Sequence, residues 1–233
     1  MPRGTEEQWI ALANGSMKIT RNGRHQYRVN DGPLLPSVTA MLGHLSGDLF
    51  GIGVNWASKL IRESGDPDAA KKSGMESANI GSRLHSTIDH FIKNNRVDEV
   101  SASPLFSVWQ EEVGYKSWLA SEKFVVNQES GYGGTVDAIA LTDEGPVLYD
   151  WKTKDATSFE KYGPDLKDQV QCAAYVAAQN SLDTQLGPIT VAKIVYVMRD
   201  GSKAVTVDVD LKRGLRLFEL AHALYKEVRG ERE

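Results

Sequence analysis

The chain has 233 residues, of which 41% are hydrophobic and 25% are charged, and its formal net charge is −4. This length and composition are ordinary for one globular domain with a substantial core. The mild negative charge argues against a generally basic nucleic-acid-binding surface, although a local basic groove stays open. The single cysteine, Cys172, excludes an intrachain disulfide and a cysteine-based metal cluster.

The chain carries no signal for export or membrane insertion. Its first residues include Glu6 and Glu7 and lack the apolar stretch of a secretory signal. No apolar run approaches the roughly 20 residues of a membrane helix. We therefore expect a cytoplasmic protein, in a bacterium or a phage-infected host cell, that does not contact a membrane.

The first third of the chain predicts a hairpin followed by helices. An Asn22-Gly23 turn favours a hairpin, and Ser37 has the side chain of a helix N-cap. The segment 43–79, rich in Gly, Ser and charge, is either a lid or a surface excursion. The elements expected in this part are a hairpin at 18–29, a helix after Ser37, and helices at 54–63 and 78–94.

The rest of the chain predicts a β-meander with helices around it. The expected elements are a helix around 105–113, strands at 124–128, 135–141 and 147–152, a helix at 168–179, a hairpin at 193–209 and a closing helix from 211. In the closing helix, one apolar side consists of Leu217, Leu220, Leu224 and Val228. This order predicts one α/β domain over 1–233, with a central mixed sheet flanked by helices. Within it, 17–79 forms an N-terminal hairpin and helical elaboration, and 80–228 the core.

Two carboxylates and a lysine meet on the predicted hairpin of 135–152. Alternation places Asp150 and Lys152 on one face of the second strand, and Asp137 lies on the first. A two-residue loop sets Asp137 opposite Asp150, whereas a three-residue loop shifts the register by about one residue, and both remain open. Because opposed like charges repel, a hard divalent cation is the simplest reason to keep them. Lys152 would then offer its charge to a phosphate or an activated water.

Two helices carry further candidates at a spacing of four residues. Gly81 and His85 share one helix face, and Gln171 and Tyr175 share another. A neutral imidazole binds a metal or orients a water, and a glutamine can hold a carboxylate, phosphate or base. Taken alone, the histidine is more often structural, and the Gln-Tyr pair is as often a polar helix edge.

The order of these motifs resembles the PD-(D/E)XK nuclease superfamily, in its RecB-like exonuclease branch. Two further segments, Leu35–Thr39 and Tyr196–Gly201, are similar to the mitochondrial genome-maintenance exonuclease and its phage and bacterial relatives. The resemblance covers residues 17–228. The motifs that carry it are Gly81 to His85, Glu129 with Gly133-Gly134 and Asp137, Asp150-Trp151-Lys152, and Gln171 to Tyr175.

The resemblance implies a restriction-endonuclease-like core with the catalytic residues Asp137, Asp150 and Lys152. It implies that His85, both aspartates and the Trp151 backbone carbonyl hold Mg²⁺ or Mn²⁺. Lys152 would position or activate the attacking water.

The same resemblance gives supporting roles to Gln171 and Tyr175, which would orient the site and the DNA. Glu129 would support the site or the DNA in a role that varies among relatives. Relatives with an iron–sulfur cluster use several cysteines, and this chain has only Cys172, so no such cluster is expected. No G-x-x-x-x-G-K-[ST] motif of a helicase motor is present.

The implied function is a metal-dependent deoxyribonuclease acting on single-stranded DNA ends in DNA repair or recombination. One alternative is a duplex-fed phage recombination exonuclease beside a single-strand annealing or binding protein. Another is a structure-specific endonuclease on the same core. A non-catalytic protein that binds metal and nucleic acid is the third, and Lys152 argues against it because metal binding does not require a lysine.

Overall fold

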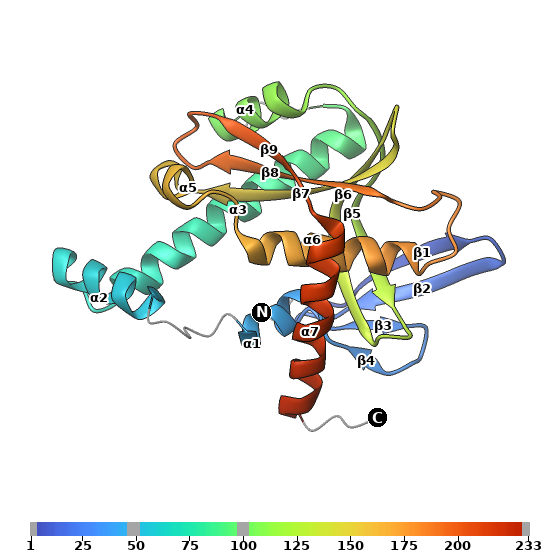
Figure 1. Cartoon of the computed structure of the whole chain (residues 1–233). Helices are drawn as coiled ribbons and strands as arrows, with labels where there is room; N and C mark the ends of the chain where they lie inside the picture. The colour runs from blue at the N-terminus through green and yellow to red at the C-terminus, as the bar shows by residue number, and fades with distance from the viewer. Residues whose placement is uncertain (1–3, 46–51, 97–102, 230–233) are drawn as a thin grey trace.

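The computed structural model describes residues 4–45, 52–96 and 103–229. Over these residues the chain forms two β-sheets and the helices around them (Figure 1). The first sheet is antiparallel, in the order β1 (Glu6–Leu12), β2 (Gly15–Arg21), β3 (Tyr27–Val29) and β4 (Leu34–Leu35). The second has the order β5 (Ser117–Asn127), β6 (Tyr132–Thr142), β7 (Gly145–Lys154), β8 (Val191–Met198) and β9 (Ala204–Asp208).

The five-stranded sheet is mixed. Strands β7 and β8 run parallel, and the other neighbours are antiparallel. The parallel step requires a crossover. Helices α5 (Ala156–Tyr162) and α6 (Leu166–Asn180) supply it. The expected α/β architecture, one domain with a mixed sheet flanked by helices, is therefore confirmed.

The expected hairpin around Asn22-Gly23 connects β2 to β3, but through a longer loop. The Asn22 side chain accepts hydrogen bonds at 3.0 Å from the backbone N–H groups of both Arg24 and Gln26. These bonds support a wider turn over residues 22–26 in place of a two-residue turn. The hairpin of β1 and β2 precedes it, and the sequence pattern did not predict that one.

Helices cover both faces of the five-stranded sheet, and strand alternation decides which residues each face buries. On one face, Val147, Tyr149 and Trp151 pack beneath α3 (Ala69–Asn94) and α4 (Pro104–Val113). On the other, Leu148 joins a core formed with α1 (Val38–Leu45), α6 and α7 (Leu211–Arg229). The predicted alternation along 147–152 is thus confirmed.

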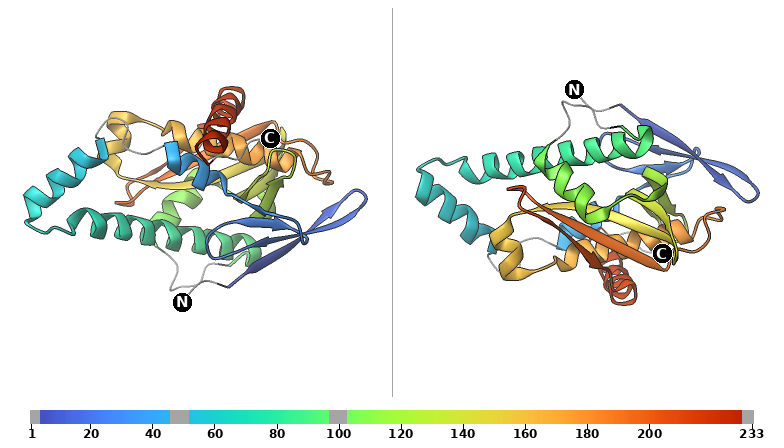
Figure 2. Two further views of the ribbon diagram at one scale, coloured as in Figure 1. Left: turned by 90° about the horizontal axis from the view of Figure 1, so that it is seen from below. Right: turned by 90° about the horizontal axis from the view of Figure 1, so that it is seen from above.

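The expected helices are present, and two of their caps follow from single residues. Ser37 accepts a hydrogen bond from the Ala40 N–H at 3.1 Å, so it begins α1 as predicted. The break at 65–68 separates α2 (Ile52–Ser64) from α3, and these two helices extend together beyond the sheet (Figure 2). Part of the segment 43–79, expected to be a lid or a surface excursion, lies outside the described residues, at 46–51.

The closing helix α7 buries a different side from the one that leucine spacing singles out. Leu220, Leu224 and Val228 are exposed by 65%, 51% and 70%. The residues that α7 buries are Gly214, Phe218, Ala221 and Tyr225. A Cβ atom at Gly214 would lie 2.7 Å from the Cβ of Ala173, so α6 and α7 approach closely where the glycine leaves room.

Among the described residues, no helix is both long and apolar enough to cross a membrane.

Candidate active site

Three neighbouring strands each bring a carboxylate to the same level of the sheet. The β6–β7 ladder has a two-residue loop and ends at the pair Ala138 and Tyr149. The next residues, Asp137 and Asp150, therefore lie opposite each other, which resolves the two registers that the sequence left open. On the other side of β6, Ser121 pairs with Ala138 and Lys123 with Val136, which sets Glu122 opposite Asp137. A row of three acidic residues thus crosses β5, β6 and β7.

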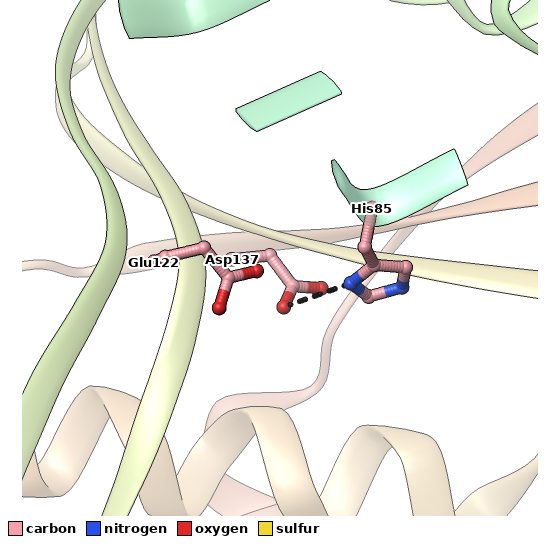
Figure 3. A group of neighbouring side chains, drawn as sticks. All are labelled: His85, Glu122 and Asp137. Carbon is pink, nitrogen blue, oxygen red and sulfur yellow. Dashed lines mark ion pairs between the residues drawn. The ribbon is translucent and has the colours of Figure 1, made fainter. Parts of the chain in front are cut away.

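Asp137 is the centre of this row and is held from two sides. Its Oδ2 accepts a hydrogen bond from the Trp151 N–H at 2.7 Å, and its Oδ1 lies 3.4 Å from Nδ1 of His85. The other ring nitrogen of His85 lies 2.9 Å from the Trp151 carbonyl oxygen. Figure 3 shows His85, Glu122 and Asp137 converging from one helix and two strands. Although burial opposes it, the charge of His85 lowers the pKa of Asp137.

His85 is protonated at neutral pH in this arrangement. Burial lowers the pKa of its imidazole, but the Asp137 carboxylate outweighs burial and raises that pKa to about 9. A protonated imidazole donates from both nitrogens, which suits acceptors at Asp137 and at the Trp151 carbonyl. Any metal that binds His85 must therefore displace a proton.

Asp150 and Lys152 form a buried ion pair beside this group. The Lys152 ammonium contacts Oδ2 of Asp150, which has no other polar partner among the described residues. Burial raises the pKa of the Asp150 carboxyl above its ordinary value. Burial opposes the charge of Lys152, but Asp150 and Asp137 raise the pKa of Lys152, so it stays a cation.

Gln171 connects the carboxylates to helix α6. Its Nε2 lies 3.5 Å from Oδ1 of Asp150 and donates to the Tyr175 hydroxyl at 3.1 Å. A Cβ atom at Gly134 would lie 2.3 Å from Cε1 of Tyr175, so the glycine is what lets the tyrosine ring press against β6. Tyr175 is 5% exposed. The ring is therefore packed against β6 inside the molecule, and it is not available to stack on a base.

A glycine at position 81 would permit another backbone to approach α3 closely, but the surroundings of Gly81 do not require a glycine. A Cβ atom there would lie 3.5 Å from Oγ1 of Thr153, which is an ordinary contact.

Glu122 is the site residue that sequence reasoning missed. Its backbone has a φ of +48°, uncommon for a residue other than glycine. Burial and the neighbouring Asp137 raise the pKa of Glu122 to about 7. A signal was available, because counting back from the Asn127 and Tyr132 pair across the β5–β6 turn sets Glu122 opposite Asp137.

Glu129, which the motif order put forward, lies elsewhere. It is exposed in the turn between β5 and β6 and lines a separate hollow with Leu12 and Met17. The structure does not bring it to the site. The acidic neighbour of Asp137 on β5 is Glu122.

An open cavity of about 850 Å³ lies in front of these groups. The long helix α3 lines it with His85 and Ser86, and the β2–β3 region lines it with Arg21 and His25. Lys152 lines the same cavity. The cavity thus gives access to the ion pair and to the histidine from one side of the molecule.

The donor set suits a hard divalent cation. One atom each of His85, Glu122 and Asp137 lies within 4.8 Å of the other two. Two ligands on opposite sides of Mg²⁺ are about 4 Å apart, so a small inward movement would close the group on an ion. Asp150 adds a buried carboxylate oxygen whose neighbour is a lysine alone, and the Trp151 carbonyl adds a neutral oxygen.

Comparisons with known proteins add no assignment. No protein-family model matches the chain, and no curated protein matches it. A solved structure described as the crystal structure of SSO0001 is 18% identical, with a TM-score of 0.34, over 80% of this chain and 84% of the other. A likeness this low supports no argument about fold or function.

Proposed function

We propose that this protein is a Mg²⁺- or Mn²⁺-dependent deoxyribonuclease of the PD-(D/E)XK type that degrades single-stranded DNA from its ends. The observation that carries the proposal is that Asp137, Asp150, Lys152 and His85 lie together, with His85 and Lys152 lining an open cavity. A purely structural role explains this group poorly, because buried ion pairs such as His85 with Asp137 and Lys152 with Asp150 are often no more stabilising than well-packed apolar residues.

His85, Asp137, Asp150 and the Trp151 carbonyl would hold the metal, which polarises a phosphate and lowers the pKa of a bound water. Other groups of the chain orient Asp137 and supply a positive charge. The Trp151 N–H fixes one oxygen of Asp137 and leaves the other facing His85. Lys152, released from Asp150 as that carboxylate turns to its ligand role, would hold the attacking water or the charge that develops on the phosphate.

Two features favour a single strand over a duplex. The cavity has a volume of about 850 Å³, comparable to a small-molecule pocket, which leaves room for a short stretch of one strand more readily than for a duplex. In addition, the chain has no nucleotide-driven motor motif that could separate strands. Because Tyr175 is buried, sequence tolerance would come from backbone contacts and not from stacking on this ring.

The test compares end-labelled linear DNA with closed-circular single-stranded DNA, each incubated with the protein and Mg²⁺. We expect degradation of the linear strand alone, and none in excess EDTA or with Asp150→Asn. Cleavage of the circle would indicate the endonuclease alternative. Binding without cleavage in Mg²⁺ and in Mn²⁺ would contradict the proposal and favour a non-catalytic nucleic-acid-binding protein.

A further inference from the structure

Arg21 is a cation fixed in the wall of the cavity by the N-terminal sheet. Its guanidinium lies 5.0 Å from the centroid of the Phe124 ring. Its Nη1 donates to the Thr135 hydroxyl at 3.0 Å, and its Nη2 donates to Glu6 at 2.6 Å. The side chain is only 15% exposed, and Arg21 is one of the residues that line the cavity.

The position of Arg21 relative to the carboxylates follows from strand geometry. Thr135, which holds the guanidinium, precedes Asp137 by two residues on β6 and points to the same face. Two residues along a strand span about 7 Å, which is the scale of one nucleotide step along an extended single strand. Lys152 contacts Asp150, on the side of Asp137 away from Glu122. Lys152 therefore lies at the Asp150 end of the acidic row, and Arg21 is held at Thr135, two residues along β6 from Asp137.

The guanidinium also keeps donors for a further anion. It has five N–H groups in a planar fork, which matches the oxygens of a phosphate. Thr135 and Glu6 each take one of them, and the Tyr27 hydroxyl, itself 2.8 Å from the Thr135 hydroxyl, lies close to the same group. Glu6 is half exposed, so its hold on Arg21 is open to competition from a strand in the cavity.

We infer that Arg21 binds the phosphate of the nucleotide next to the cleaved bond, and that Glu6 competes with the DNA strand for it. This inference rests on the proposed nuclease function and names the backbone contact that holds the strand in register. Arg21 touches the substrate and not the reacting atoms, so it acts through binding and alignment.

The test uses two substitutions that act in opposite directions. Affinity for a single-stranded oligonucleotide is measured in Ca²⁺ for the whole protein, over a range of salt concentrations. Arg21→Gln should weaken binding about tenfold, as expected for a lost charge-assisted contact. It should also reduce the slope of log affinity against log salt by about 0.7, the value of one phosphate contact on a single strand. Glu6→Gln should strengthen binding about twofold to threefold.

Arg28→Gln is the matched control, because Arg28 is an exposed arginine in β3 of the same sheet and does not line the cavity. It should change neither the affinity nor the salt slope. Thermal melting of each variant shows whether it folds. If Arg21→Gln fails to fold, Arg21→Lys replaces it and should weaken binding with little change in slope, because the charge remains.

Unchanged affinity and slope in a folded Arg21 variant, together with active wild-type protein, would overturn the inference while leaving the nuclease proposal in place. Weaker binding by Glu6→Gln would also overturn it, since that result makes the ion pair structural. Wild-type protein that neither binds nor cleaves the oligonucleotide would contradict the proposed function itself.

Discussion

Lys152 is the residue whose role most clearly separates catalysis from metal binding. Its ammonium contacts Asp150, and the residue lines the cavity in which negative charge would develop on a phosphate. We expect Lys152→Ala to remove most of the cleavage rate and to leave DNA affinity nearly unchanged, because the contact is greatest in the transition state. Single-turnover rates and binding are measured separately, with Lys193→Ala as the control, because Lys193 is a partly buried strand lysine paired to Asp208 outside the cavity.

The opposite pattern in these two measurements would change the reading of Lys152. A large loss of DNA affinity with a normal single-turnover rate makes it a phosphate contact. Removing one partner of a buried ion pair also destabilises a fold, by about 3–5 kcal/mol. Rates are therefore compared only after melting in Mg²⁺ shows that the variant is folded.

Glu122 makes the stability of the metal-free protein depend on pH. Burial and Asp137 raise the pKa of Glu122 to about 7 in the folded state, above its ordinary value of 4.5. Between these values the folded state binds more protons than the unfolded state, so stability falls as pH rises from about 4.5 to 7. Glu122→Gln removes this loss. In EDTA, we expect it to exceed wild type at pH 8 by roughly 2 kcal/mol, after allowing for partial exposure.

Urea unfolding at pH 5 and pH 8 checks the Glu122 prediction. The difference between variant and wild type should shrink toward pH 5, where the folded-state carboxyl is protonated and the pH approaches 4.5, the ordinary pKa at which the unfolded state also takes up the proton. With saturating Mg²⁺ the order of stability should reverse. The metal ion then neutralises the Glu122 carboxylate, whereas the neutral glutamine side chain gains no such attraction. A pH-independent difference would show that the carboxyl ionises normally.

At the level of elements, one strand of the small sheet fixes the backbone of the large one. The Gln8 side chain, from β1, donates to the Glu122 carbonyl at 2.6 Å and accepts from the Phe124 N–H at 2.8 Å. It thereby satisfies two backbone groups of β5 at the point where φ is positive. The N-terminal sheet therefore helps to fix the backbone of β5 at the site.

The contact between α6 and β6 depends on a residue without a side chain. We expect Gly134→Ala to destabilise the fold by about 1–3 kcal/mol, because its Cβ would overlap the Tyr175 ring, which has no free space to enter. Gly81→Ala is the matched control, since its Cβ meets only an ordinary contact and alanine favours a helix interior by about 1 kcal/mol. Chemical unfolding of both variants measures the difference, and equal stabilities would contradict it.

Metal binding should stabilise the whole molecule, because the ligands come from α3, β6 and β7 and meet only in the folded chain. At a metal concentration 100 times its dissociation constant, the gain is about 2.7 kcal/mol. We expect Mg²⁺ and Mn²⁺ to raise the melting temperature of wild type, and Asp150→Asn to abolish that shift. In EDTA the variant should melt below wild type, because Lys152 then loses its carboxylate partner. A metal-induced shift that persists in Asp150→Asn would place the ion elsewhere.

The sequence by itself determined the features that depend on local periodicity. Alternation along 147–152 sorted Asp150 and Lys152 from Tyr149 and Trp151, and the helical spacing of His85 and of Gln171 with Tyr175 found the correct faces. These assignments need only the repeat of one element, because neighbouring residues fix which side a residue faces.

Tertiary structure decided everything that joins distant parts of the chain. The β5–β6 register brought Glu122 to Asp137 and left Glu129 in a far turn, while the small sheet added Arg21 to the cavity. The buried side of α7 was set by close contact with α6 at Gly214 and not by its leucines. Such pairings depend on which surfaces fit together across the fold, and the spacing of residues within one element carries no information about its partner.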